Sequence, residues 1–405
     1  MLARIHHHRR YTANHTWYLD AAGRHLFVKA NPNRTEARRE TLGHRRLCGR
    51  YPIPDLYVHG PLGRWYLHVY RRQPGVGTDQ GMLLDLLAAA DHAGPGSTAW
   101  KALQAAATAL IGHYRQVIAT TAAPVEPSRL ETKLFADRAA PGGRLDTYYR
   151  STRLAWMISP LGAELTIRDI PNTTLVINGD ASRLDLPGAL DQLRAHFTRS
   201  PQRVWAALTQ GDPTGFNLGW TSEAGPFWFD YDTAGTNALA GEFAVFLVDV
   251  LLHGARLTPS TNPAAYLDHP AALADHTVGD GVQLRRVEPG LVELDMHYQP
   301  SLARRWLATT YLHELVSPTA AQADIRDVAR WLRPWLLMRL LAVYHPADLH
   351  YIDALLLLAT IIRVLNPDLD VPMTELFTVT AVQTDPPLPV ATPPARQPAA
   401  PGDSR

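Results

Sequence analysis

The chain has 405 residues, of which 46% are hydrophobic and 19% charged, and its 39 basic and 38 acidic residues leave a net charge of +1. This length and apolar content allow one large core or two lobes, and size favours two. A net charge near zero excludes a bulk electrostatic attraction to nucleic acid, to an anionic membrane or to a strongly cationic ligand. Partners must therefore be selected by local sites, and we expect neither nucleic acid nor membrane among them.

Cysteine content and hydropathy indicate the compartment. Cys48 is the single cysteine, so no intramolecular disulfide can form, and residues 1–10 lack the apolar core of a secretory signal. The apolar run 354–362 ends at Arg363 and is much shorter than the roughly 20 residues that a membrane-spanning helix needs. We therefore expect a cytoplasmic protein without a membrane segment.

Residues 15–70 have the pattern of short antiparallel strands around one helix. The segment HTWYLDAAGRHLFVKA (15–30) is strand-like and broken by an Ala-Gly turn signal, and WYLHVY (65–70) is rich in aromatic residues. Between them, residues 35–51 are dense in Arg and Glu, which predicts one helix with a solvated face that ends before Pro52. We expect this lobe to span residues 1–72.

A second, mostly helical lobe is expected over residues 73–382, because Ala- and Leu-rich runs at helical spacing begin at Gly81. Within it, residues 125–200 have the character of an insertion, in which 165–179 suggests a hairpin. The proline-rich tail, 383–405, is expected to be disordered.

The most informative segment is TQGDPTGFNLGWTSEAGPFWFDYD, residues 209–232. Asn217 follows Asp212 by five positions, and Asp230 follows Asn217 by thirteen, at the end of an apolar run. Phosphoryl transfer from ATP needs a carboxylate that accepts the proton of the attacking hydroxyl, and an amide oxygen and a second carboxylate that hold magnesium. A hairpin over 218–229 would place Asn217 and Asp230 side by side.

This pattern resembles the aminoglycoside phosphotransferase and choline kinase-like family, whose loop usually reads His-Gly-Asp-x-x-x-x-Asn. The resemblance implies a bilobal, protein-kinase-like α+β fold, with a small antiparallel sheet and one helix in the first lobe and a larger helical second lobe. It implies that Asp212 is the catalytic base and that Asn217 and Asp230 bind Mg²⁺. The chain departs from the family pattern at Gln210, where His is usual, and at Glu242, where Asp is common.

The amino-terminal part resembles the same family more loosely. Lys29, in the strand LFVKA, is placed to reach the ATP phosphates, and Glu40 on the next helix to pair with it. Glu36, one helical turn earlier, is the alternative partner. Val69 and Arg71 mark the hinge strand near the adenine. Residues 6–14, where the family has a phosphate-covering loop, contain no glycine.

The sequence therefore predicts an ATP- and Mg²⁺-dependent kinase that phosphorylates a hydroxyl of a small molecule, such as an antibiotic or a biosynthetic intermediate. Between residues 125 and 200 there are ten Arg or Lys and nine Asp or Glu residues, a balance that argues mildly against a polycationic acceptor. Two alternatives stay open. One is a kinase of Ser or Thr in a natural-product precursor peptide, and the other is a catalytically silent, nucleotide-binding scaffold.

Overall fold

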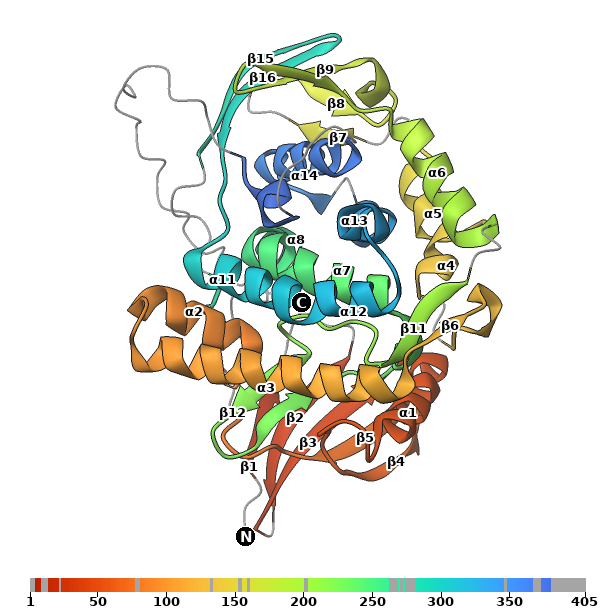
Figure 1. Ribbon diagram of the computed structural model, residues 1–405, viewed down its shortest axis with the longest axis vertical. Helices are drawn as coiled ribbons and strands as arrows, with labels where there is room; N and C mark the ends of the chain where they lie inside the picture. Colours follow the sequence, from red (N-terminus) through yellow and green to blue (C-terminus); the bar gives the residue numbers. More distant parts are fainter. Residues whose placement is uncertain are drawn as a thin grey trace, which may run out of the picture.

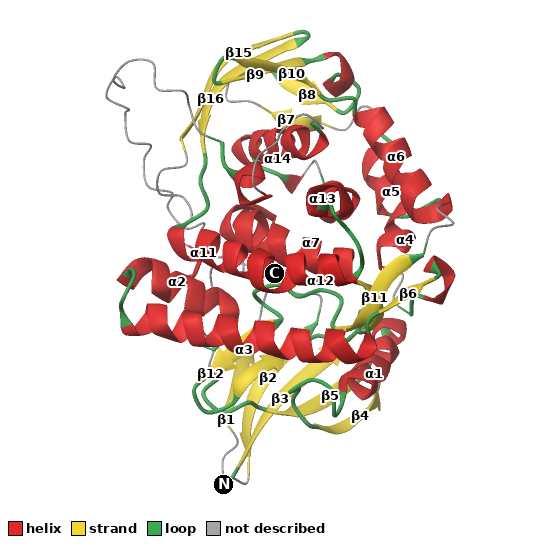
Figure 2. Cartoon of the chain, in the orientation of Figure 1, coloured by secondary structure: helices red, strands yellow, loops and turns green. Residues whose placement is uncertain are grey.

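The computed structural model describes residues 4–8, 14–21, 23–76, 81–131, 134–151, 155–158, 161–199, 203–261, 269, 272–273, 281–345, 348–366 and 373–379. One β-sheet lies at the amino-terminal end of the molecule, and the helices occupy its centre (Figures 1 and 2).

The first sheet is antiparallel and has five strands in the order β1-β2-β3-β5-β4. They are β1 (Arg4–His8), β2 (His15–Ala21), β3 (Arg24–Asn31), β4 (Leu56–Leu62) and β5 (Trp65–Arg71). Strand β3 pairs with β2 on one side and β5 on the other, so both of its backbone edges are hydrogen-bonded within the sheet. This central strand carries Lys29.

The loop expected over residues 6–14 begins later than the sequence suggested. Residues 6–8 are the end of β1 and pair with β2, because backbone N–H and C=O groups can form a ladder whatever the side chains. Residues 9–13 lie outside the described residues.

Helix α1 (Arg34–Leu47) follows β3 directly and is the one helix of this lobe. The side chain of Asn33 accepts hydrogen bonds from the N–H groups of Thr35 and Glu36, which satisfies donors that the first helical turn leaves unpaired. The buried face of α1 includes Glu40 as well as apolar residues. The helix therefore holds one carboxylate against the sheet.

The remaining chain is mainly helical. Its helices are α2 (Leu83–Ala93), α3 (Thr98–Thr121), α4 (Leu134–Ala139), α5 (Arg144–Tyr149), α6 (Leu186–Arg199), α7 (Leu239–Val248), α8 (Thr258–Thr261), α11 (Leu302–Tyr311), α12 (Ser317–Gln322), α13 (Val328–Val343) and α14 (Tyr351–Leu365). The π-helical segments η3 (Asp249–Leu257) and η5 (Leu312–Val316) continue α7 and α11, and the 3-10 turns are η1 (Pro127–Arg129), η2 (Ile170–Asn172) and η7 (Met373–Phe377).

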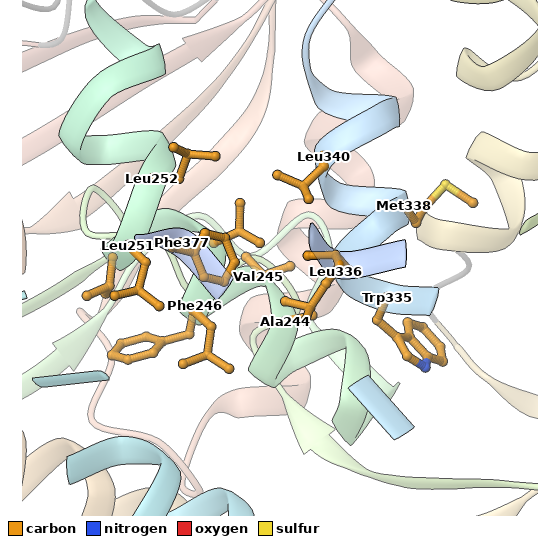
Figure 3. Packing of buried hydrophobic residues seen from close by; sticks show 14 of the residues in the cluster. Ala244, Val245, Phe246, Leu251, Leu252, Trp335, Leu336, Met338, Leu340 and Phe377 are labelled. Atoms are coloured by element: carbon orange, nitrogen blue, oxygen red, sulfur yellow. The ribbon is translucent and has the colours of Figure 1, made fainter. Parts of the chain in front are cut away.

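The core of the helical lobe lies between α7 with η3 and the helix α13. Figure 3 shows Ala244 and Val245 of α7 on one side and Leu336 and Leu340 of α13 on the other, all fully buried. Burying a valine or leucine side chain stabilises a fold by about 1.5–3 kcal/mol. A small antiparallel sheet with one helix, joined to a larger helical lobe, confirms the predicted α+β architecture.

Short strands support the helical lobe. They form the three-stranded sheet of β6 (Ala123–Val125), β11 (Val204–Thr209) and β14 (Gly235–Ala238), the hairpin of β12 (Leu218–Thr221) and β13 (Gly225–Trp228), the pair β7 (Ala155–Ile158) and β8 (Glu164–Thr166), and the four-stranded sheet of β9 (Thr174–Ile177), β10 (Asp180–Arg183), β15 (Gly281–Glu288) and β16 (Leu291–His297). The β12-β13 hairpin is the one predicted around residue 222.

The prediction of a hairpin over residues 165–179 is wrong. Strand β8 pairs with β7, whereas β9 pairs with β10 and, in parallel, with β16. The strand that completes this sheet comes from more than a hundred residues later in the chain, and a local pattern carries no information about so distant a partner.

Among the residues that the structure describes, no helix has both the length and the apolar content needed to cross a bilayer.

A testable consequence of this packing concerns Gly43 of α1, which lies against the loop after β13. A Cβ atom at Gly43 would be 1.8 Å from the carbonyl oxygen of Tyr231, so Gly43→Ala should lower the free energy of unfolding by about 1–3 kcal/mol. Gly112 of α3 has no atom within 4 Å of such a Cβ, and Gly112→Ala should instead gain about 0.5–1 kcal/mol from helix propensity. Urea denaturation of both variants measures this, and equal effects would contradict the close approach.

Candidate active site

A buried ion cluster joins the two lobes. The Nζ of Lys29 lies 2.7 Å from Oε2 of Glu40 and 2.7 Å from Oδ1 of Asp230. The Lys29 and Glu40 side chains are 7% and 1% exposed, whereas that of Asp230 is 37% exposed. Glu36, the alternative partner, instead accepts a hydrogen bond from Asn31 at 3.0 Å. The ammonium therefore connects α1 to the hairpin segment of the helical lobe.

The local conformation of each element places these three groups together. Lys29 lies on the central strand, and its side chain points to the same face as that of Phe27. Asp230 follows strand β13 and has a φ of 58°, an unusual conformation for a residue with a side chain. Such conformations persist only where surrounding contacts enforce them, and they concentrate at functional sites.

The electrostatics of the cluster follow from one cation facing two carboxylates. Burial disfavours the ammonium, but the charges of Asp230 and Glu40 outweigh it and raise the pKa of Lys29 above its usual range. Burial raises the pKa of Glu40, against the attraction of Lys29. The Tyr70 hydroxyl donates to Oε1 of Glu40 at 2.8 Å, so both oxygens of this buried carboxylate have neighbours that stabilise negative charge.

Asp212 and Asn217 lie in the loop between β11 and β12. The side-chain amide of Asn217 donates to the backbone carbonyl of Asp212 at 3.0 Å, which closes the loop on itself. The N–H of Phe229 donates a hydrogen bond to the carbonyl of Asn217. Asn217 is therefore paired with the residue that immediately precedes Asp230. The hairpin thus brings Asn217 next to the segment that carries Asp230, with 5% of Asn217 exposed.

Gln210 is fully buried and connects the loop of Asp212 to that of Asp230. Its side-chain amide donates to the carbonyls of Phe229 at 2.9 Å and Asp230 at 2.5 Å, and its oxygen accepts from the N–H of Asp212 at 2.8 Å. Both ends of the amide are therefore used. Gln210 stands where the family that the sequence resembles usually has His, and its amide donates and accepts at once.

Two buried carboxylates accept hydrogen bonds from the backbone of the loop between β11 and β12. Glu242 of α7 accepts from the N–H of Gly211 and from the hydroxyls of Thr209 and Tyr114, each at 2.8 Å. Asp249 of η3 accepts from the N–H of Gly215 at 2.6 Å. Burial raises the pKa of Glu242 to about 7 and that of Asp249 to about 6. Glu242, whose role the sequence left undefined, is thus an anchor of the loop backbone.

A cavity of about 70 Å³ lies between the sheet and the ion cluster. Its lining includes Lys29, Tyr70 and Arg72, with Phe229 and Asp230 from the other lobe. Tyr70 and Arg72 alternate along the chain with Val69 and Arg71, so the latter two side chains project to the opposite face of the sheet. Any contribution of Val69 and Arg71 to a nucleotide site would therefore come from their backbone groups.

The sequence analysis missed the residues that surround Asp212. The Nη1 of Arg339, on α13, donates to Oδ1 of Asp212 at 2.9 Å, and the two side chains are 4% and 30% exposed. Arg138 of α4 and Asp249 are also buried near this loop. The sequence does indicate that Arg339 and Asp249 are paired. Each is an isolated charge within an apolar run, WLLMRLLAVY for Arg339 and FAVFLVDVLL for Asp249, and a buried charge needs a partner.

The donor set is suited to a magnesium ion held jointly with a nucleotide. No group of three or more His, Cys, Asp or Glu side chains is arranged to hold a metal among the described residues. Mg²⁺ is usually bound by one or two carboxylates together with substrate phosphates, rather than by a complete protein cage. The Asp230 carboxylate and the Asn217 amide oxygen are donors of that kind, on segments paired by the hydrogen bond from the N–H of Phe229 to the carbonyl of Asn217.

The bilobal α+β architecture, with a buried Lys-Glu pair in the sheet lobe and an Asp-containing loop in the helical lobe, is a protein-kinase-like fold. No protein-family model matches the chain, and no curated protein matches it. Solved structures similar to it include aminoglycoside phosphotransferase APH(4)-Ia (12% identity, 90% of this chain and 95% of that chain, TM-score 0.49), amicoumacin kinase hAmiN (13%, 93% and 89%, 0.38) and Plasmodium vivax ethanolamine kinase (9%, 93% and 80%, 0.40).

The raised pKa of Glu242 predicts a pH dependence of stability. Its pKa is about 7 in the folded chain against an ordinary value of 4.5, so its contribution is complete below pH 4.5 and is lost as the pH rises through 7, at about 1.4 kcal/mol per pH unit. Glu242→Gln should flatten this decline in urea midpoints measured between pH 4.5 and 8. The exposed Glu164→Gln serves as the control, and a slope unchanged in Glu242→Gln would refute the assignment.

Proposed function

We propose that this protein is an ATP-dependent phosphotransferase that moves the γ-phosphate to a hydroxyl group of a small molecule. The observation that carries the proposal is the Lys29 ammonium, which lies 2.7 Å from both the buried Glu40 of the sheet lobe and Asp230 of the helical lobe. A kinase site requires a lysine that is held by a carboxylate and faces the metal-binding aspartate across the cleft. The Asp212 loop lies beside that aspartate, joined to it through Gln210.

In this assignment Lys29 binds the α- and β-phosphates of ATP, and Glu40 positions it. Tyr70 supports Glu40 from the side away from the lysine through its 2.8 Å hydrogen bond. A buried charge with fixed partners does not need to reorganise when the phosphates arrive, which is how electrostatic stabilisation accelerates a reaction. Asn217 and Asp230 would hold the magnesium ion, which when bound neutralises charge on the β- and γ-phosphates.

Asp212 acts as the general base in this proposal. The acceptor oxygen bonds to the γ-phosphorus, the bond from that phosphorus to the bridging oxygen of ADP breaks, and the hydroxyl proton passes to the carboxylate. The Arg339 guanidinium contacts Oδ1 of Asp212 and fixes the orientation of the carboxylate. We assign the other carboxylate oxygen, Oδ2, to the acceptor hydroxyl.

The contacts of Gln210 favour an enzyme over a silent scaffold. The scaffold alternative arises from the absence of the usual His at this position and from the lack of glycine in residues 6–14. Gln210 nevertheless donates to the Asp230 segment and accepts from the N–H of Asp212. The loop geometry that the His would maintain therefore has another source. A precursor peptide stays an alternative acceptor that turnover assays on Ser- and Thr-containing peptides would detect.

Nucleotide binding can be tested by thermal denaturation. Mg²⁺ and ATP at about 100 times their dissociation constant should stabilise the protein by about 2.7 kcal/mol and raise its Tm. Asp230→Ala should lose the magnesium-dependent part of this rise, because it removes a carboxylate ligand. Asp180→Ala, at an exposed position in the β9-β10 hairpin, should keep it. A wild-type protein that does not respond to Mg²⁺ and ATP would end the proposal.

A substitution of Asp212 tests whether this residue serves the chemical step rather than nucleotide binding. Asp212→Asn keeps an oxygen for Arg339 but removes the base, so ADP formation with an alcohol acceptor should fall by about 10²–10⁴-fold. The Tm increase with Mg²⁺ and ATP should persist in the variant. If nucleotide binding and turnover were lost together, Asp212 would have a structural role instead.

A further inference from the structure

Two buried arginines lie near Asp212, and a third, exposed arginine acts on one of them. Arg339 belongs to α13, Arg138 to α4 and Arg144 to α5. Arg339 and Arg138 are 4% and 8% exposed, which is unusual for guanidinium groups. Their charges act on one another, because burial first and then Arg339 and Arg144 lower the pKa of Arg138 to about 9, while Asp212 opposes this effect. The acceptor side of Asp212 therefore concentrates positive charge.

The three guanidinium groups differ in their partners. Arg339 donates to Asp212 at 2.9 Å, and Arg144 donates to the carbonyl of Ala342 at 3.3 Å. The Nε and Nη1 atoms of Arg138 are buried and have no hydrogen-bond partner among the described residues. Its neighbour on α4 is the Phe135 ring, whose centroid lies 6.0 Å from the guanidinium carbon. Leaving buried charged donors unpaired is costly, so a missing anion is the simplest explanation.

No carboxylate is paired with Arg138 among the described residues. Asp249 and Glu242 are buried and directed at backbone N–H groups of the loop. Burial raises the pKa of Glu242 to about 7, so this carboxyl carries only part of its negative charge near neutral pH. Asp137, adjacent to Arg138 in the chain, is exposed to solvent. The buried Nε and Nη1 donors of Arg138 are therefore not hydrogen-bonded to any of these carboxylates.

We propose that the phosphate acceptor carries an anionic group, a phosphate, sulfate or carboxylate, that Arg138 binds beside the hydroxyl facing Asp212. The planar guanidinium offers parallel N–H donors that match two oxygens of such a group. A cationic acceptor would instead meet like charges, which oppose binding. This inference rests on the proposed function, because it assigns the acceptor of the same site.

Sulfate is the probe for this anion site. The Tm of the full chain would be measured against sodium sulfate with saturating Mg²⁺ and the ATP analogue AMP-PNP, at an ionic strength held constant with NaCl. With the nucleotide phosphates already bound, wild type should show a saturable rise in Tm. Arg138→Gln should shift the half-saturating sulfate concentration at least about tenfold upward, the loss expected for hydrogen bonds to a charged group.

The matched control is Arg363→Gln, a half-buried arginine of α14 that donates to the carbonyl of Glu375. It should respond to sulfate as wild type does. The same response in all three proteins, or no saturable response in wild type, would overturn the anion site. A response that disappears when AMP-PNP is present would also overturn it, because the anion would then be the transferred phosphate rather than part of the acceptor.

Arg138→Lys, which keeps the positive charge, is the second variant. If neither Arg138→Gln nor Arg138→Lys folds, turnover by the wild-type protein tests the inference. Wild type would be assayed for ADP formation with three-carbon acceptors that differ in charge, namely glycerol, glycerate and glycerol phosphate, and with choline as the cationic alcohol. An anionic member should have a kcat/KM at least about tenfold above the others, and a preference for glycerol or choline would contradict the inference. Loss of the Mg²⁺–ATP response would instead refute the kinase assignment, so the two failures are distinguishable.

Discussion

The two lobes meet at one buried ammonium group. Lys29 and Asp230 are 201 residues apart in the chain, yet their charged atoms lie 2.7 Å apart, with Glu40 at the same distance on the other side. The buried ammonium is expensive to separate from its partners, because Glu40, at 1% exposed, would lose its counter-charge in a desolvated site. This contact links strand β3, helix α1 and the segment of Asp230, whose φ is 58°.

Much of the sheet lobe and of this cluster could be predicted from the sequence, because the relevant signals are local. Lys29 follows from its place in an alternating apolar strand, Glu40 from a charged helix that ends before a proline, and the Asp212, Asn217 and Asp230 spacing from one continuous segment. The structure brings Lys29, Glu40 and Asp230 into contact and links the Asp212 loop to Asp230 through Gln210. Their roles in nucleotide and metal binding stay predictions.

The surroundings of Asp212 could not be predicted from the sequence, for a physical reason. Arg339 is 127 residues from its partner Asp212, and Arg138 acts on the same loop from a helix that the sequence identified only as part of an insertion. The total charge over residues 125–200 is almost balanced. A charge count does not show that the guanidinium of Arg138 is buried while the neighbouring carboxylate of Asp137 is exposed. The parallel pairing of β9 with β16 could not be predicted for the same reason, because the sequence of neither strand identifies so distant a partner.

The glutamine that connects the two active-site loops also has a consequence for proton chemistry. An imidazole in that position would gain a charge at mildly acidic pH and would then donate from both nitrogens, so it could no longer accept from the N–H of Asp212. A carboxamide does not titrate under such conditions. The hydrogen bonds that Gln210 makes to Phe229, Asp230 and Asp212 therefore do not change with protonation of the side chain between acidic and neutral pH.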